Sequence, residues 1–143
     1  MVKNYKAIVL DPKYTPKKTE KYMSEEQKAY FYQLLNAQRA ELLSAIDEYM
    51  NDLSESTNID AMDGANDEGD DSTAIQSSDM LQKMIGRNRN AVGLIDNALD
   101  RLENGTYGFS VLSNEEIGLK RLMARPLATL TTAEQEEHEH AEI

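Results

Sequence analysis

A strict heptad seam between residues 81 and 102 constrains the fold of this chain more than any other feature. Its members repeat at alternating steps of four and three, with Asn88 as the one polar interruption. Such a repeat is typical of an α-helix that packs lengthwise against a second helix. The members are Leu81, Ile85, Asn88, Val92, Ile95, Leu99 and Leu102.

A second stripe, further upstream, supplies the partner helix. It recurs at the steps of three or four expected for one face of a helix, and it consists of Phe31, Leu35, Gln38, Leu42, Ala45, Tyr49 and Leu53. A chain reversal near residues 66–68 brings the two stripes into register. The sequence therefore predicts a mostly α fold built on a long antiparallel coiled-coil hairpin. Core packing is the ordinary role of such stripes, so they indicate no functional site of their own.

Start and stop signals mark the ends of the hairpin. Residues 24–27 (Ser-Glu-Glu-Gln) fit a capping box at a helix start, and residues 103–105 (Glu-Asn-Gly) fit a helix end. We therefore divide the chain into an N-terminal arm (1–22), the hairpin (23–104) with an acidic tip near 60–72, and a small globular base (105–143). The arm has two of the three prolines and no periodicity, so we expect it to be extended or loosely docked. The base should end in a C-terminal helix from about Thr131.

Charge and motif content narrow the function. The net charge of −11 argues against direct binding to DNA or to an anionic membrane. No apolar run reaches the roughly 20 residues that span a bilayer, and the N-terminus lacks the apolar core of a secretory signal, so we expect a cytoplasmic protein. With no cysteine, the chain has neither disulfides nor thiolate metal ligands. No catalytic motif appears, so we predict no catalytic residues and no enzyme.

The predicted hairpin tip is strongly acidic. Six carboxylates fall between residues 60 and 71: Asp60, Asp63, Asp67, Glu68, Asp70 and Asp71. The order of ligands required by a calcium loop is missing. Composition leaves two interpretations open: a solvated acidic loop, or an acidic probe that the hairpin delivers into a basic or metal-containing site on a partner.

Two segments carry a family resemblance. They are Leu102–Phe109 (LENGTYGF) and Ile117–Leu122 (IGLKRL), the latter followed by Ala124-Arg125-Pro126. Their sequence and spacing resemble the signature of the DksA/TraR family, and the similarity extends over residues 23–140. The resemblance implies a bacterial, monomeric transcription regulator of the stringent response. In that family the hairpin enters the secondary channel of RNA polymerase, at the β′ subunit, as Gre-type factors do.

The same resemblance assigns roles to the tip. The family has an Asp-x-x-Asp-x-Ala motif there, and Asp67, Asp70 and Ser72 fall on its positions. This implies destabilisation of the open promoter complex near the polymerase active site, with Asp70 as the critical carboxylate. Two alternatives stay open: a coiled-coil adaptor without polymerase control, and a Gre-like stimulator of transcript cleavage whose carboxylates help to hold Mg²⁺.

The zinc module of the family is degenerate in this chain. Its four cysteine positions correspond to Ser110, Ser113, Thr131 and Glu134. Three hydroxyls and one carboxylate are not a tetrahedral zinc set, so we predict no structural zinc and no other metal. Residues 131–134 (Thr-Thr-Ala-Glu) form a capping box that could take over part of the role of the metal, and residues 113–116 have the same form at a turn. We hypothesise that the protein works when zinc is scarce or thiols are oxidised.

Two arginines are candidates for contacts with a partner. Arg87 and Arg125 belong to a small basic population that either pairs with nearby carboxylates or contacts an acidic surface of the polymerase. In the family, guanosine tetraphosphate binds between the factor and the polymerase, and Arg125 is one of the implied contacts. The other two basic positions are Leu94 and Gln135 here, which makes synergy with the alarmone doubtful. His138 and His140 lie two residues apart and therefore do not share a helix face as metal ligands would.

Overall fold

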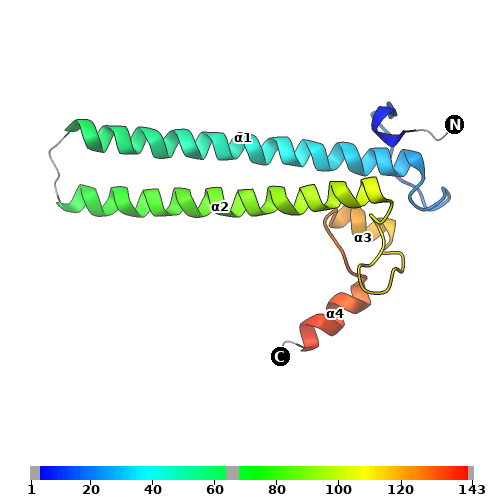
Figure 1. Cartoon of the computed structure of the whole chain (residues 1–143). Coiled ribbons are helices and arrows are strands. Elements are labelled where there is room, and N and C mark those ends of the chain that lie inside the picture. The colour runs from blue at the N-terminus through cyan, green and yellow to red at the C-terminus, as the bar shows by residue number, and fades with distance from the viewer. Residues whose placement is uncertain (1–3, 64–67, 142–143) are drawn as a thin grey trace. The chain divides into compact units, whose positions relative to one another are not determined.

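The computed structural model describes the backbone of residues 4–63 and 68–141, and the side chains of residues 4–55 and 77–141. A short 3₁₀ helix, η1 (Tyr5–Ala7), is followed by two long helices, α1 (Glu25–Asp63) and α2 (Glu68–Asn104) (Figure 1). Two short helices complete the chain, α3 (Leu119–Ala124) and α4 (Thr132–Ala141). This confirms the mostly α prediction. Within the described segments no helix is both long and apolar enough to cross a membrane.

The chain divides into two compact units. The central unit comprises residues 38–94, and the terminal unit comprises the residues up to Ala37 together with those from Ile95 onward. Both long helices contribute to each unit. The predicted arm and globular base belong to the terminal unit, together with the adjoining parts of α1 and α2.

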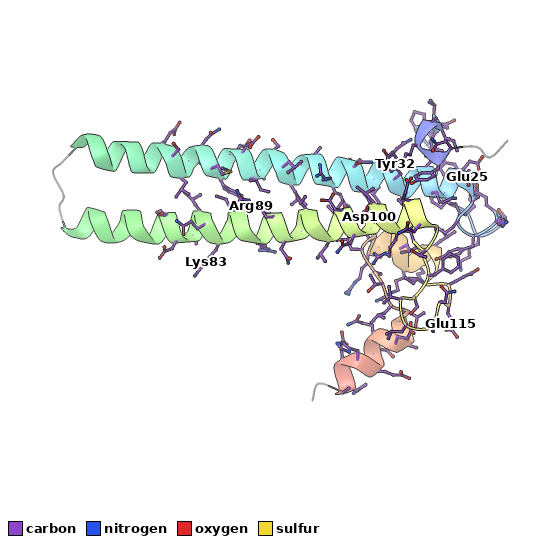
Figure 2. The ribbon with its side chains drawn as sticks, in the orientation of Figure 1. Glu25, Tyr32, Lys83, Arg89, Asp100 and Glu115 are labelled. Atoms are coloured by element: carbon purple, nitrogen blue, oxygen red, sulfur yellow. The ribbon has the colours of Figure 1, made fainter. Side chains whose placement is uncertain are left out.

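The central unit is a two-helix seam. Ile46 on α1 is buried with Ile85 and Val92 on α2, and Leu42, Tyr49 and Leu53 pack around them. Every described member of both predicted stripes is buried or partly buried, so the predicted hairpin is confirmed. Arg89 extends from α2 toward α1, and its guanidinium lies 3.6 Å from the sulfur of Met50 (Figure 2).

The terminal unit has a richer core that includes aromatic rings. Phe31 on α1 is fully buried, and its ring lies 5.4 Å from the ring of Tyr107, centroid to centroid. Leu102 at the end of α2 and Leu122 on α3 are also buried. The apolar residues after the hairpin therefore bury themselves against both long helices and do not form a separate core.

The N-terminal arm contacts this core through tyrosines. The Tyr5 ring meets the Tyr32 ring edge to face at 5.5 Å, and its hydroxyl donates to the Glu103 carboxylate at 3.2 Å. Tyr14 packs in the same way on Tyr30, at 6.3 Å. Such ring pairs add about 0.5–1.5 kcal/mol each beyond the area that they bury. The arm is therefore held at several points along its length.

The start of α1 joins the arm to the hairpin. As the capping box predicts, the backbone N–H of Gln27 donates to the Ser24 hydroxyl at 3.3 Å. The Gln27 side chain reaches back to accept from the Met23 N–H at 2.8 Å, and its amide group donates to the carbonyl of Lys17 at 3.2 Å. Gln27 itself is fully buried, so its polar side chain depends on these bonds for partners.

Candidate functional site

The acidic tip lies largely outside the described residues. Asp67 falls in the gap between α1 and α2, whereas Asp70 and Ser72 lie in α2 by their backbone, with side chains outside the described set. Their roles at the tip therefore stay predictions from the family motif.

The four degenerate zinc-ligand positions, in contrast, are well described, and two of them lie on a tight loop. We call residues 108–118 the knuckle loop; Glu115 on it is labelled in Figure 2. The Ser110 N–H donates to the Glu115 carbonyl at 2.8 Å. The Ser110 hydroxyl accepts from the amides of Leu112 at 3.1 Å and Ser113 at 3.2 Å. The buried Ser110 side chain thus organises the turn by hydrogen bonding alone.

The other two positions cap α4. The Thr131 N–H donates to the Glu134 carboxylate at 2.9 Å, and the Glu134 N–H donates to the Thr131 hydroxyl at 3.2 Å. This reciprocal pair is the predicted capping box. In the similar stretch at residues 113–116 the Glu115 N–H donates to the Ser113 hydroxyl at 3.4 Å, but no helix begins there, so this motif serves a turn.

The Glu134 carboxylate brings all four positions together. Its pKa is lowered to about 2, first by the hydrogen bond from the Thr131 backbone and then by hydrogen bonding from the side chains of Ser110, Ser113 and Thr131. Hydrogen bonding to a carboxylate favours its charged form, so these hydroxyl side chains stabilise the Glu134 anion. We call this set of four residues the Glu134 cluster. It ties the knuckle loop to the first turn of α4.

The Glu134 cluster does not fit zinc. Structural zinc is held by thiolate, imidazole and carboxylate, and three of the four side chains here are neutral hydroxyls. No group of three His, Cys, Asp or Glu side chains that could hold a metal occurs among the described residues. His138 and His140 lie in the last turn of α4 and do not join the cluster.

A tyrosine from the arm braces the knuckle loop, and sequence analysis missed it. The Tyr22 hydroxyl donates to the Gly108 carbonyl and accepts from the Gly118 N–H at 3.0 Å. It therefore joins the two ends of the loop, where both glycines have positive φ. Partial burial raises the pKa of Tyr22, so the hydroxyl keeps its proton for donation. The only sequence signal for it is its position two residues before the capping box.

A second tyrosine fixes the far side of the base. The Tyr107 hydroxyl donates to the Pro126 carbonyl at 2.8 Å, and burial raises the Tyr107 pKa. Tyr107 belongs to the family signature, so the resemblance marked it without explaining it. Its hydrogen bond positions the residues that precede α4.

Arg87 and Arg125 lack the ion pairs that one interpretation required of them among the described residues. Arg87 and Arg125 are exposed, and neither forms an ion pair within the described residues. Arg125 borders a hollow of about 540 Å³ that Lys18 and Lys120 also line. Leu94 is 49% exposed, and the Gln135 amide donates to Glu139 at 3.3 Å. Arg125 is thus open to a partner, while Gln135 already has a partner on its own helix.

Comparisons with known proteins identify the family. No family model matches the chain. It is 37% identical over 131 residues to "RNA polymerase-binding transcription factor DksA" of Caulobacter vibrioides, covering 90% of this chain and 87% of the relative. It is 32% identical over 119 residues to the protein of the same name from Escherichia coli K12, with coverages of 82% and 74%.

A solved structure agrees with these matches. The structure of transcription factor DksA2 from Pseudomonas aeruginosa matches with a TM-score of 0.76 and 33% identity, covering 85% of this chain and 89% of that chain. The sequence signature, the helical hairpin and these similarities therefore lead to one conclusion: the chain belongs to the DksA family.

Proposed function

We propose that this protein is a transcription regulator that binds bacterial RNA polymerase and catalyses no reaction itself. The observation that carries the proposal is its 37% identity, over 90% of its length, to a relative named for RNA polymerase binding. The hairpin supplies a suitable scaffold, since its two long helices pack along a narrow aliphatic seam. The regulator acts in the cytoplasm, where its polymerase is found.

The mechanism follows from the family motif at the tip. The hairpin enters the secondary channel at the β′ subunit, and Asp67 and Asp70 approach the polymerase active site. Carboxylates placed there compete for cations or repel other acidic groups, which shortens the lifetime of the open promoter complex. Ser72 in place of the family's alanine keeps the residue small and adds a hydroxyl, so we expect altered strength and the same mode of action.

The regulator works without zinc. This proposal is supported by the Glu134 cluster, because the four positions that hold a metal in the family here carry three neutral hydroxyls and one carboxylate, and Thr131 and Glu134 cap α4 reciprocally. A carboxyl group with a pKa of about 2 is fully ionised at cellular pH, so Glu134 keeps its negative charge under ordinary conditions. Without sulfur ligands, it also offers no thiol to oxidants.

Synergy with guanosine tetraphosphate is weak in this proposal. Phosphate recognition needs several converging cations, and only Arg125 of the three implied positions supplies one. Leu94 is apolar, and the Gln135 amide is bonded to Glu139. Titrating the alarmone against factor and polymerase tests this point; strong synergy would contradict it.

The decisive experiment measures the lifetime of an open ribosomal promoter complex with purified polymerase. We expect the wild-type protein to shorten the lifetime, Asp70→Asn to lose most of that effect, and Asp79→Asn, an exposed carboxylate on the same helix, to retain it. A chelator or mild peroxide should leave the wild-type effect unchanged. Loss of activity on either treatment would refute zinc independence.

The same variants separate the two alternatives. An adaptor would bind polymerase equally well with or without Asp70 and would leave the promoter complex unchanged. A cleavage stimulator would shorten backtracked RNA in the presence of Mg²⁺. If the protein fails to bind polymerase in any of these assays, the proposed function is wrong.

A further inference from the structure

The knuckle loop exposes two large aliphatic side chains side by side in sequence. Val111 is 60% exposed and Leu112 is 73% exposed. Both side chains are therefore mostly unpacked within the chain, and exposed aliphatic residues next to one another in a turn offer apolar surface to a partner.

The backbone of this turn is held firmly. The Val111 N–H donates to the Thr129 carbonyl at 3.0 Å, and the Leu112 N–H donates to the Ser110 hydroxyl at 3.1 Å. The Asn114 N–H closes the turn onto the Ser110 carbonyl at 3.0 Å. Because the turn is already ordered, a partner that binds it loses little conformational entropy, which favours affinity.

A cation lies beside the two aliphatic side chains. Arg101, in the last turn of α2, borders a hollow of about 360 Å³ together with Phe109, Val111 and Leu112. Partial burial lowers the Arg101 pKa, and no carboxylate in the described part of the chain forms an ion pair with it. A partly desolvated guanidinium whose donors have no anionic partner favours a carboxylate from elsewhere.

We propose that the knuckle loop and Arg101 form a docking surface for a segment of RNA polymerase that presents an apolar side chain next to a carboxylate. This rests on the proposed function, which makes the polymerase the partner. We infer the carboxylate of the partner segment from charge complementarity. A chain of net charge −11 repels acidic segments in general, and a local cation such as Arg101 offsets that repulsion at this surface. Arginine and aromatic residues contribute most to binding when they lie at the centre of an interface, and Arg101 and Phe109 border the same hollow as Val111 and Leu112.

Equilibrium binding to purified core polymerase tests the surface, with the full-length protein labelled at its N-terminus. The double variant Val111→Ser/Leu112→Ser should weaken binding at least tenfold. Arg101→Gln should weaken it similarly and should also reduce the dependence of affinity on salt. The matched control is Val9→Ser, which alters a valine that is 94% exposed elsewhere and should bind like wild type.

Thermal melting of each variant accompanies the binding assay. Val111 and Leu112 are exposed, so the double variant should melt like wild type and remains decisive even if Arg101→Gln is destabilised. Wild-type affinity in the double variant would overturn the docking surface while leaving the proposed function intact. Failure of the wild-type protein itself to bind polymerase would overturn both. A dimer by light scattering that Val111→Ser/Leu112→Ser dissociates would show that a second copy, and not polymerase, occupies the surface.

Discussion

The two units hold their parts of α1 and α2 together in different ways. The central unit relies on a narrow aliphatic seam around Ile46, Ile85 and Val92. The terminal unit adds aromatic pairs and hydrogen bonds between residues distant in sequence, with Phe31 and Tyr107 in its core. Elements with few buried apolar contacts open at lower free energy. The comparison teaches that the stability of the central unit rests on the packing of α1 against α2. The stability of the terminal unit also draws on aromatic contacts and hydrogen bonds between segments distant in sequence.

The largest expected effect comes from the core of the terminal unit. Phe31→Ala removes a fully buried ring and should lower the free energy of unfolding by about 3–5 kcal/mol. Ile85→Ala in the central seam should cost about 2 kcal/mol, since its neighbours Leu42, Tyr49 and Leu53 are only partly buried.

Urea unfolding combined with amide hydrogen exchange checks both variants. We expect Ile85→Ala to accelerate exchange mainly within residues 38–94, and Phe31→Ala to accelerate it throughout. Equal, global effects of the two variants would contradict the division into units of different stability.

A smaller effect is expected at the brace of the knuckle loop. Tyr22→Phe keeps the ring that packs edge to face on Phe109, at 5.5 Å, and removes only the hydroxyl that joins Gly108 to Gly118. Leaving those groups without their partner should cost about 1–3 kcal/mol in thermal unfolding. Tyr14→Phe is the matched control, because the Tyr14 hydroxyl donates to Glu20, a partly exposed residue six positions away in the same arm, and its loss should have a smaller effect. Indistinguishable melting of the two variants would show that the brace is dispensable.

The smallest effect, and the one most specific to the Glu134 cluster, is its pH dependence. Because the pKa of Glu134 is lowered from 4.5 to about 2 in the folded protein, its contribution to stability is complete above about pH 4.5 and is lost as the pH falls toward 2. Glu134→Gln should lower the melting temperature at pH 7 and flatten its pH dependence in this window.

Glu137→Gln, at an exposed position on the same helix, serves as the control and should preserve the wild-type pH profile. Thermal melts between pH 2 and pH 7 make the comparison. If Glu134→Gln leaves the profile unchanged, the carboxylate does not join α4 to the knuckle loop.

Sequence reasoning succeeded where the deciding interactions are local or periodic. The heptad seam predicted the helix pair because successive members lie three or four residues apart, about one helical turn. Both capping boxes at helix starts were predicted because their partners lie three residues apart. The family spacing identified the four degenerate zinc-ligand positions but not the contacts between them.

Contacts between distant segments could not be predicted in this way. The docking of the arm depends on tyrosines such as Tyr5 and Tyr22, whose partners lie more than 80 residues away in the chain. No periodicity links such positions, and the sequence of a proline-containing segment does not distinguish a docked tyrosine from an exposed one. The convergence of the hydroxyls on Glu134 likewise required the path of the chain between the knuckle loop and α4.

The brace at Tyr22 also has a consequence for the order of folding. Its two hydrogen bonds span sequence separations of 86 and 96 residues. Contacts of this length form late, because the loop they close must first be ordered, and during synthesis they must wait until Gly118 has left the ribosome. The N-terminal arm therefore cannot dock stably until the knuckle loop has been synthesised. Residues of the arm are synthesised before the knuckle loop but dock only after that loop has formed, and their docking completes the terminal unit.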